Sequence, residues 1–375
     1  MSIFLYSFFI ILLIVFIIYL LWKYESHLPS FFNILNKNKG NVPQSVNDWL
    51  VLLGNKKKIN GIYYFHTDYK NHLISTGHKT FEKKELIDEN TSFRLASVSK
   101  QFTAFAMMLL NKEKKIDYET QVSAILKEFP SKSVTIRHLL NHTSGVTADY
   151  IKLAKKYKPT KESVLSNTEA TKLICKNTNE DIVPLELFYY NNSNYILLAR
   201  IIELTSNLSF EEYMKANVFE KLNLKNTFVW NLFSKDKLLK KPNVANGFEA
   251  YLKSKPIYIK PSWLDGVAGD GAIFSSLNDL KKWLSFWEGN NFLNSDELNE
   301  AFKKPLLLDG SYSNYGFGWV IEDEFVWHNG KWLANNALVI KSIKDNKTLI
   351  VLDNSTNNRF EKISKILIQT IFKND

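Results

Sequence analysis

The stretch Phe93–Phe102 reads FRLASVSKQF and is followed by the apolar run TAFAMMLL. Ser97 and Lys100 in this stretch are three residues apart, a spacing that places two side chains on one face of a helix. Apolar residues recur every three to four positions after Ser97, which predicts a helix. A serine hydroxyl is a poor nucleophile at neutral pH unless a base lies beside it. We therefore expect the Lys100 amine to lie against the Ser97 hydroxyl where a buried helix begins.

Two further motifs follow in the chain. YYNNSNY supplies Tyr190 and Asn192 as Y-x-N, and WHNGKW supplies His328 and Gly330 as H-x-G after a strand-like run. An S-x-x-K hydrolase needs a nucleophile with its Lys, a polar loop with Tyr or Ser and Asn, and a strand whose Gly lets the substrate approach. S-x-x-K alone is often an exposed cap followed by a solvated Lys, so the prediction depends on all three motifs.

In these motifs, in their order and in their separations, the sequence resembles the serine β-lactamase and penicillin-binding-protein family. The likeness is to its class C β-lactamase, D-alanyl-D-alanine carboxypeptidase and esterase-like branch. It covers roughly residues 46–372 and includes the phrases TIRHLLNHTSG, NYILLARIIE, SFEEYMKANVFEKLNLKNT, GDGAIFSSLNDLKKW and YGFGW.

The resemblance implies an α+β fold of the β-lactamase/transpeptidase type. We expect an antiparallel sheet of about five strands flanked by helices, and a mostly helical subdomain at roughly residues 110–290. Strand-like runs near both ends of the chain, with helical patterns between them, fit this architecture.

The same resemblance implies roles for four residues. Ser97 would attack a carbonyl carbon and become acylated, and Lys100 would help to remove its proton. Tyr190 would pass that proton to the leaving group and then activate water for deacylation. Asn192 would orient Lys100 and the substrate amide.

The third motif departs from the family's penicillin-specialised members, which usually have Lys at position 328. His328 would orient substrate or Tyr190, but it would hold a substrate carboxylate weakly because histidine is largely neutral near pH 7. The backbone N–H groups of Ser97 and of Lys331, which follows Gly330, would form the oxyanion hole. The sequence lacks E-x-x-L-N, so deacylation driven by a class A glutamate is not supported.

Composition narrows the functional classes. The chain has 375 residues, is 45% hydrophobic and carries a formal net charge of +10. Almost all of the positive charge is Lys, whereas Arg is the preferred side chain for phosphate and base recognition. We therefore expect no nucleic-acid partner. Cys175 lies at an apolar helical position, has no second cysteine to pair with, and is not expected to be a nucleophile.

The N-terminal residues Ile3–Trp22 are uncharged and long enough to span a bilayer as a helix. No basic region precedes them and no small-residue cleavage site follows, so we expect residues 1–22 to be a retained anchor rather than a signal peptide. Residues 23–44 read as a linker and 45–375 as the hydrolase domain. Lys residues after the anchor favour a cytoplasmic body, whereas cell-wall chemistry favours the extracytoplasmic, periplasmic side, which we prefer.

These inferences predict a single-pass, membrane-anchored serine hydrolase with a monomeric catalytic domain and neither metal nor organic cofactor. Its substrates would be D-alanyl peptidoglycan peptides or small esters. The alternative is a non-catalytic domain that binds peptidoglycan fragments. Ser99, His138 and His142 are interpreted as structural, and the glycine turn AGDGA (residues 268–272) as a loop near the cleft.

Overall fold

The computed structural model describes residues 46–67, 70–80, 84–157, 163–236, 238, 243–249, 256–289, 291–356 and 359–372. The chain divides into two compact units, Met1–Val42 and Pro43–Asp375, and the described residues belong to the second. The predicted anchor (1–22) and the whole of the predicted linker (23–44) therefore lie outside the described residues. None of the helices from Val46 onward has both the length and the apolar character that crossing a bilayer demands.

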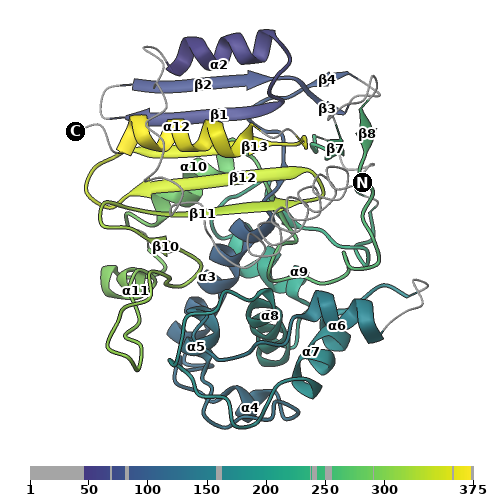
Figure 1. Cartoon of the computed structure of the whole chain (residues 1–375), viewed down its shortest axis with the longest axis vertical. Helices are drawn as coiled ribbons and strands as arrows, with labels where there is room; N and C mark the ends of the chain where they lie inside the picture. The colour runs from purple at the N-terminus through teal and green to yellow at the C-terminus, as the bar shows by residue number, and fades with distance from the viewer. Residues whose placement is uncertain are drawn as a thin grey trace, which may run out of the picture. The chain divides into compact units, whose positions relative to one another are not determined.

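The described strands occur in two regions, before and after a long helical segment (Figure 1). The strands are β1 (Gly61–Thr67), β2 (Lys70–Thr76), β3 (His78–Thr80), β4 (Glu85–Leu86), β5 (Phe93–Arg94), β6 (Phe228–Val229), β7 (Phe248–Glu249), β8 (Ile257–Tyr258), β9 (Ile273–Ser275), β10 (Val320–Ile321), β11 (Phe325–Trp332), β12 (Asn335–Ser342) and β13 (Thr348–Asp353). The helices are α2 (Val46–Asn55), η1 (Ala96–Val98), α3 (Ser99–Lys112), α4 (Val122–Ile125), α5 (Ile136–Leu140), α6 (Tyr150–Tyr157), α7 (Asn167–Lys176), α8 (Asn192–Ser206), α9 (Phe210–Met214), η2 (Lys215–Phe219), α10 (Leu277–Phe286), α11 (Ser295–Glu300) and α12 (Phe360–Phe372).

The main sheet has six strands in the order β10-β11-β12-β13-β1-β2. Its neighbouring strands are antiparallel, and β1 joins β13 with Gly61 opposite Asp353. The expected sheet of about five strands is thus extended by β10, which contributes only two residues. One sheet is assembled from the two ends of the domain, as the sequence predicts.

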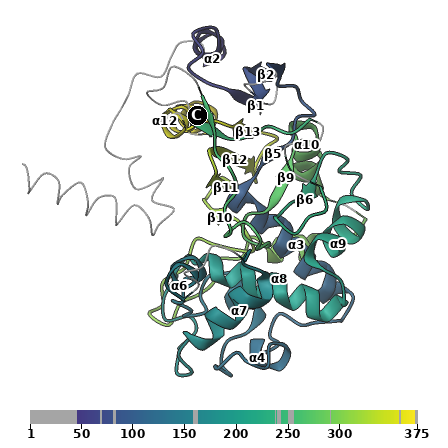
Figure 2. The same cartoon turned by 90° about the vertical axis from the view of Figure 1, so that its right-hand side faces the viewer.

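Helices cover both faces of this sheet (Figure 2). α2 and α12 lie on one face, and α10 lies on the other. All eight residues of β12 are buried, because a central strand between two helical layers has no solvent-facing side.

The helical segment packs below the sheet in Figure 1, and α3 connects the two parts. Twelve of the fourteen residues of α3 are buried, so the helix is enclosed on all sides, as its apolar pattern predicts. The expected helical region of roughly 110–290 is helical through Phe219, whereas short strands from β6 to β9 follow before α10. One of these, β9, pairs with β5, the strand that leads into η1.

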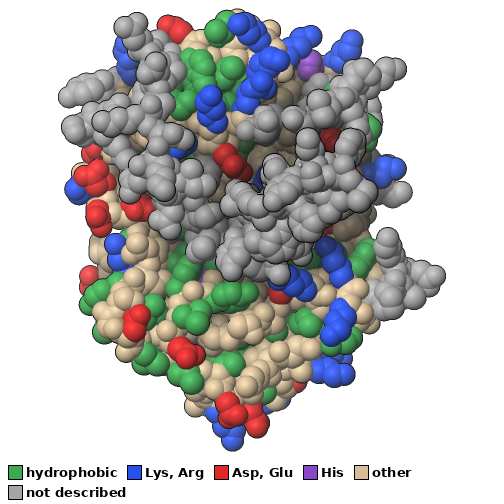
Figure 3. Space-filling view, in the orientation of Figure 1, with side chains coloured by type: hydrophobic (Ala, Val, Ile, Leu, Met, Phe, Trp, Pro, Cys, Tyr) green, Lys and Arg blue, Asp and Glu red, His purple; other side chains and the backbone are tan. Residues whose placement is uncertain are grey.

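Basic side chains are distributed over both parts of the face seen in Figure 3, with acidic side chains between them.

Candidate active site

Ser97 lies in η1, the short 3-10 turn immediately before α3. The preceding residue, Ala96, has a φ of 47°, a left-handed conformation that costs free energy for a residue with a Cβ. This turn leaves Ser97 half-buried at the N-terminal end of α3, where the free N–H groups favour negative charge. Ser99, in contrast, is fully buried and its hydroxyl accepts a hydrogen bond from Ile273 N at 3.1 Å, which fits a structural role.

Lys100 is fully buried one helical turn after Ser97. Its Nζ lies 3.1 Å from Ser97 Oγ, 2.8 Å from Asn192 Oδ1 and 3.1 Å from the Asp270 carbonyl oxygen. The structure therefore brings together the first motif and the Asn of the second, although they are about ninety residues apart. Asn192 is the first residue of α8, so helix geometry fixes the position of its amide.

Tyr190 also lies close to the Lys100 amine. Lys100 Nζ lies 5.1 Å from the centre of the Tyr190 ring, within the range of a cation–π contact. The ring also packs against His142 at 4.5 Å and against His328 at 6.1 Å between centroids. The hydroxyl of half-buried Tyr190 forms no hydrogen bond within the described residues, so it is free to act on a substrate.

His328 on β11 is buried, and both of its ring nitrogens have partners. Nδ1 lies 2.6 Å from the Asn329 carbonyl oxygen, and Nε2 lies 2.9 Å from the Tyr315 hydroxyl. A carbonyl can only accept, so Nδ1 carries the proton and Nε2 accepts from Tyr315. Burial, with a smaller contribution from Lys100, lowers the pKa of His328 to about 3. The imidazole is therefore neutral, and it reaches substrate directly only if a protein partner is displaced.

Gly330 and Lys331 follow on the same strand. A Cβ at position 330 would lie 2.1 Å from the Leu95 carbonyl oxygen and 2.8 Å from Ser97 N, so only glycine lets β11 approach the turn that holds Ser97 this closely. Lys331 lines the same small cavity as Ser97, and its side chain is exposed. This placement is compatible with the predicted oxyanion hole, which needs only the two backbone N–H groups.

The Ser97 cavity has a volume of about 60 Å³. Ser97 and Asn192 line it together with apolar residues and other polar residues. The complete lining is Arg94, Ala96, Ser97, Tyr150, Ile151, Asn192, Leu264, Asp265, Val267, Asp270, Gly271, Lys331 and Trp332. Arg94 Nη1 pairs with Asp265 Oδ1 at 3.1 Å, and both side chains are almost completely buried. Trp332 Nε1 donates to the same carboxylate at 2.7 Å.

Three side chains near the site belong to none of the three motifs. Tyr315 belongs to the phrase YGFGW, which contributed to the resemblance but was given no role. Asp270 belongs to the AGDGA turn, expected only to lie near the cleft. His142, interpreted as structural, packs on Tyr190, and its Nδ1 lies 2.9 Å from Asn194 Nδ2. Only the proximity of these residues to Ser97 or Tyr190 distinguishes them, and a single sequence does not encode that proximity as a pattern.

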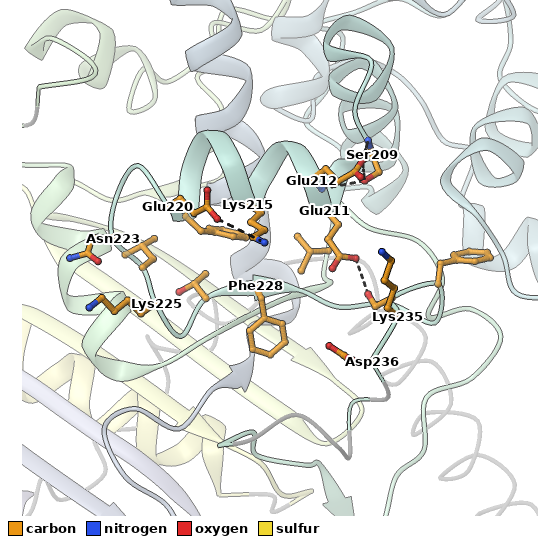
Figure 4. Close-up of a pocket in the computed structure, with 16 residues that line it drawn as sticks. Ser209, Glu211, Glu212, Lys215, Glu220, Asn223, Lys225, Phe228, Lys235 and Asp236 are labelled. Atoms are coloured by element: carbon orange, nitrogen blue, oxygen red, sulfur yellow. Dashed lines mark hydrogen bonds and ion pairs between the residues drawn. The ribbon is translucent and has the colours of Figure 1, made fainter.

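A wider cavity of about 770 Å³ lies between α9, η2 and residues 223–236 (Figure 4). It shares no lining residue with the Ser97 cavity. Its two serines have acceptor partners: Ser209 Oγ lies 2.7 Å from Glu212 Oε2, and Ser234 Oγ lies 2.9 Å from Glu211 Oε2. Ser209 caps α9, so this cavity offers no second activated serine.

Two other chemistries are poorly supported in the described part of the chain. No group of three or more His, Cys, Asp or Glu side chains is arranged there to hold a metal ion. Burial raises the pKa of Cys175 to about 12, so its thiol is protonated and a poor nucleophile.

Comparisons of sequence connect this geometry to known proteins. The Beta-lactamase family model matches residues 50–369. Penicillin-binding protein 4* of Bacillus subtilis (strain 168) is 31% identical over 339 residues, which cover 80% of this chain and 69% of that protein. Protein flp of Staphylococcus aureus (strain MW2) is 24% identical over 312 residues, which cover 76% of this chain and 57% of that protein.

Solved structures share the fold. A penicillin-binding protein from Bacillus halodurans superposes with a TM-score of 0.72 at 23% identity, covering 86% of this chain and 98% of that one. D-amino acid amidase from Ochrobactrum anthropi SV3 superposes with a TM-score of 0.68 at 18% identity, covering 86% and 95%. With the family model matching most of the domain and a relative above 30% identity, we conclude that this chain belongs to the beta-lactamase family.

Proposed function

We propose that this serine hydrolase cleaves an amide or ester bond through an acyl-enzyme on Ser97. The contact between Lys100 Nζ and Ser97 Oγ, at 3.1 Å, carries the proposal. A neutral amine has two N–H groups and one lone pair. If the N–H groups bind Asn192 Oδ1 and the Asp270 carbonyl oxygen, the lone pair points to the remaining neighbour, the Ser97 hydroxyl. Lys100 is then placed to accept the proton as Ser97 attacks.

Acylation then uses the other residues around Ser97. The attacked carbonyl oxygen becomes negatively charged and would be bound by the backbone N–H groups of Ser97 and Lys331. Removing one donor of this kind typically costs about 10²–10³ in rate. Tyr190, whose hydroxyl is free, would protonate the leaving group. Water would then hydrolyse the ester and release Ser97.

D-alanyl peptides of peptidoglycan are the first substrate class that we propose, and small esters are the second. The names of the relatives, penicillin-binding protein and D-amino acid amidase, support a substrate with a D-amino acyl group. The neutral, doubly hydrogen-bonded His328 is poorly suited to hold a substrate carboxylate. An uncharged ester or amide therefore remains a credible substrate beside a peptide with a free carboxyl end.

The proposed location follows from this chemistry and from the sequence. Residues 3–22 would anchor the protein in a membrane, and the catalytic domain would act as a monomer on the extracytoplasmic side, where peptidoglycan lies. Protease protection of spheroplasts that express the tagged full-length chain tests this placement. A catalytic domain that resists protease until the membrane is permeabilised would contradict it.

A labelling and turnover experiment tests the proposed function. The full-length chain and Ser97→Ala are treated with a fluorophosphonate probe and a fluorescent penicillin, and hydrolysis of nitrocefin, a D-Ala-D-Ala peptide and p-nitrophenyl esters is measured. We expect at least one probe to label only the unmodified chain, and turnover to depend on Ser97. If neither probe labels it while Ser97→Ala still binds peptidoglycan fragments, the protein is a binding domain instead.

A Tyr190→Phe variant tests the proton transfer separately. It keeps the ring that packs on His142 and removes only the hydroxyl. Turnover should fall while substrate affinity stays close to that of the unmodified chain, and a loss confined to KM would contradict the proposed role.

A further inference from the structure

The Ser97 cavity contains a carboxyl group that the three motifs do not include. Asp270 is 8% exposed and lines the cavity together with Ser97. A volume of about 60 Å³ is large enough to hold water. Tyr190, to which the resemblance gives the activation of water, is not among the residues that line this cavity. A water molecule in this cavity would lie against residues that include Ser97 and Asp270.

Hydrogen bonds hold Asp270 in place from two sides. Its Oδ2 accepts from the Tyr150 hydroxyl at 3.0 Å, and its carbonyl oxygen accepts from Lys100 Nζ at 3.1 Å. The carboxyl also accepts a hydrogen bond from its own backbone N–H, and Tyr150 is the one side chain of the described residues that binds it. Because Ser97 Oγ and the Asp270 carbonyl oxygen both lie 3.1 Å from Lys100 Nζ, they are at most about 6.2 Å apart.

The glycine before Asp270 lets this turn pass close to α8. Gly269 has a φ of +117°, and a Cβ there would lie 2.5 Å from the Tyr195 carbonyl oxygen. A Cβ at Gly271 would be 3.7 Å from Ala96, the residue before the nucleophile. The turn thus passes between α8 and η1 and carries the Asp270 side chain to the cavity.

The cavity contains a second carboxylate, Asp265, and both of its oxygens already have partners. Asp265 pairs with Arg94 and also accepts hydrogen bonds from Trp332 and from the Ser262 backbone, the last at 2.7 Å. Asp270 forms no salt bridge with a Lys, Arg or His of the described residues. Of the two, Asp270 is the carboxyl bound by a single side chain, so lone pairs on its oxygens remain for a water molecule.

We propose that Asp270 is the general base that activates the water that hydrolyses the Ser97 acyl-enzyme. This inference rests on the proposed function, because it needs the ester on Ser97. It adds to that function a catalytic residue that none of the three motifs contains.

The proposed step balances as follows. The water oxygen forms a bond to the acyl carbon while one of its protons moves to Asp270 Oδ1. The bond between the acyl carbon and Ser97 Oγ then breaks, and Oγ takes a proton from Lys100, which received one during acylation. The products are the free acid and the restored serine. The proton on Asp270 then passes through solvent to Tyr190, which gave its own proton to the leaving group during acylation.

The environment of Asp270 suits a base. Burial raises the pKa of its carboxyl, whereas Lys100, Tyr150 and Arg94, which face it from α3, α6 and β5, oppose the shift. A carboxylate with a raised pKa accepts a proton more readily than one in free solution. Asp265 also lines the cavity, but its carboxylate is already bound by Arg94 and Trp332.

Stopped-flow kinetics and intact-protein mass spectrometry with p-nitrophenyl acetate test the proposal on the full-length chain. Asp270→Asn keeps the shape of the side chain and the backbone carbonyl that binds Lys100. We expect a burst of p-nitrophenol at a rate near that of the unmodified chain, then turnover slowed about 10²-fold or more. The acetylated protein should accumulate, with the acetyl group on Ser97. Tyr150→Phe, which releases only Oδ2, should show the same pattern with a smaller decrease.

Each contrary result has a distinct meaning. If Asp270→Asn deacylates at the normal rate, or if its burst and turnover slow equally, Asp270 is not the base. If Tyr190→Phe accumulates the acetyl-enzyme and Asp270→Asn does not, Tyr190 has the role instead. If the unmodified chain is never acetylated on Ser97 by any ester of the panel, the proposed function itself fails, whatever Asp270 does.

Discussion

Gly330 on β11 lies directly against the turn that holds Ser97. A side-chain carbon at position 330 would stand 2.8 Å from Ser97 N and 2.1 Å from the Leu95 carbonyl oxygen. Because residue 330 is glycine, the backbone of β11 can contact the backbone of the turn that holds Ser97, although the two segments are far apart in the sequence. This contact brings the N–H groups of the proposed oxyanion hole to one place.

Gly330→Ala should accordingly damage both the site and the fold. The added methyl group cannot be accommodated unless β11 or η1 moves, because backbone atoms surround it. We expect kcat/KM for a p-nitrophenyl ester to fall about 10²-fold or more, as when an oxyanion-hole donor is lost, and the Tm to decrease. In Gly271→Ala the added carbon would meet Ala96 only at 3.7 Å, so its Tm should stay close to that of the unmodified chain. Equal Tm values for the two variants would contradict this account.

Lys100→Ala should slow acylation of Ser97 by orders of magnitude, because the hydroxyl loses the only amine that contacts it in the described structure. The rate of fluorophosphonate labelling measures this step, and circular dichroism shows whether the fold is retained. Lys127→Ala, at an exposed position where Nζ binds only the Ala124 carbonyl oxygen, is the matched control and should label normally. Near-normal turnover in Lys100→Ala would remove this amine from the mechanism.

His328 should be neutral and protonated on Nδ1 at pH 5, where an exposed histidine is charged. Nitrogen chemical shifts of the imidazole measure both properties. Tyr315→Phe removes the hydroxyl that donates to Nε2, a hydrogen bond that only the neutral ring accepts, so this variant should raise the pKa of His328. An imidazolium signal for His328 in the unmodified chain at pH 5 would show that the assigned tautomer is wrong.

The same residue should make stability depend on pH. Its folded-state pKa of about 3 lies below the unfolded value of about 6.5, so the unfolded state binds more protons between these values. The stability associated with neutral His328 is therefore complete above about pH 6.5 and is lost as the pH falls towards 3. Thermal unfolding at pH 7 and pH 4.5 should show a larger loss for the unmodified chain than for His328→Asn. A parallel loss in both proteins would exclude this contribution.

The ion pair between Arg94 and Asp265 should matter much more than ion pairs on the surface. Both side chains are almost completely buried, so Asp265→Asn leaves a buried guanidinium without its counter-ion. The free energy of unfolding should decrease by about 3–5 kcal/mol, as measured by urea denaturation. Glu324→Ala breaks the exposed pair with Lys344, at 3.0 Å, and should change it little. Similar values for the two variants would contradict the importance of burial here.

Several elements could be predicted from the sequence because their signals are local. The apolar spacing after Ser97 predicts the buried helix α3, and the strand-like runs at both ends predict one sheet assembled from distant segments. The three-residue spacing of Ser97 and Lys100 predicts their contact, since helix geometry fixes it within one turn. The resemblance supplied the fold class and the remaining motif residues, whereas the roles assigned to Tyr190, Asn192, His328 and Lys331 stay predictions.

The sequence by itself thus determined the fold family and the contact between Ser97 and the Lys100 amine. The tertiary structure alone decided that Tyr315 occupies one nitrogen of His328, that Arg94 is paired with Asp265, and that the Asp270 carboxyl lines the Ser97 cavity. These relationships join residues 13 to 173 positions apart, and no period or motif spacing spans such distances. Burial also sets the protonation states of these groups, because removing water raises the free energy of a charge. Burial is a property of the folded chain, not of any short stretch of it.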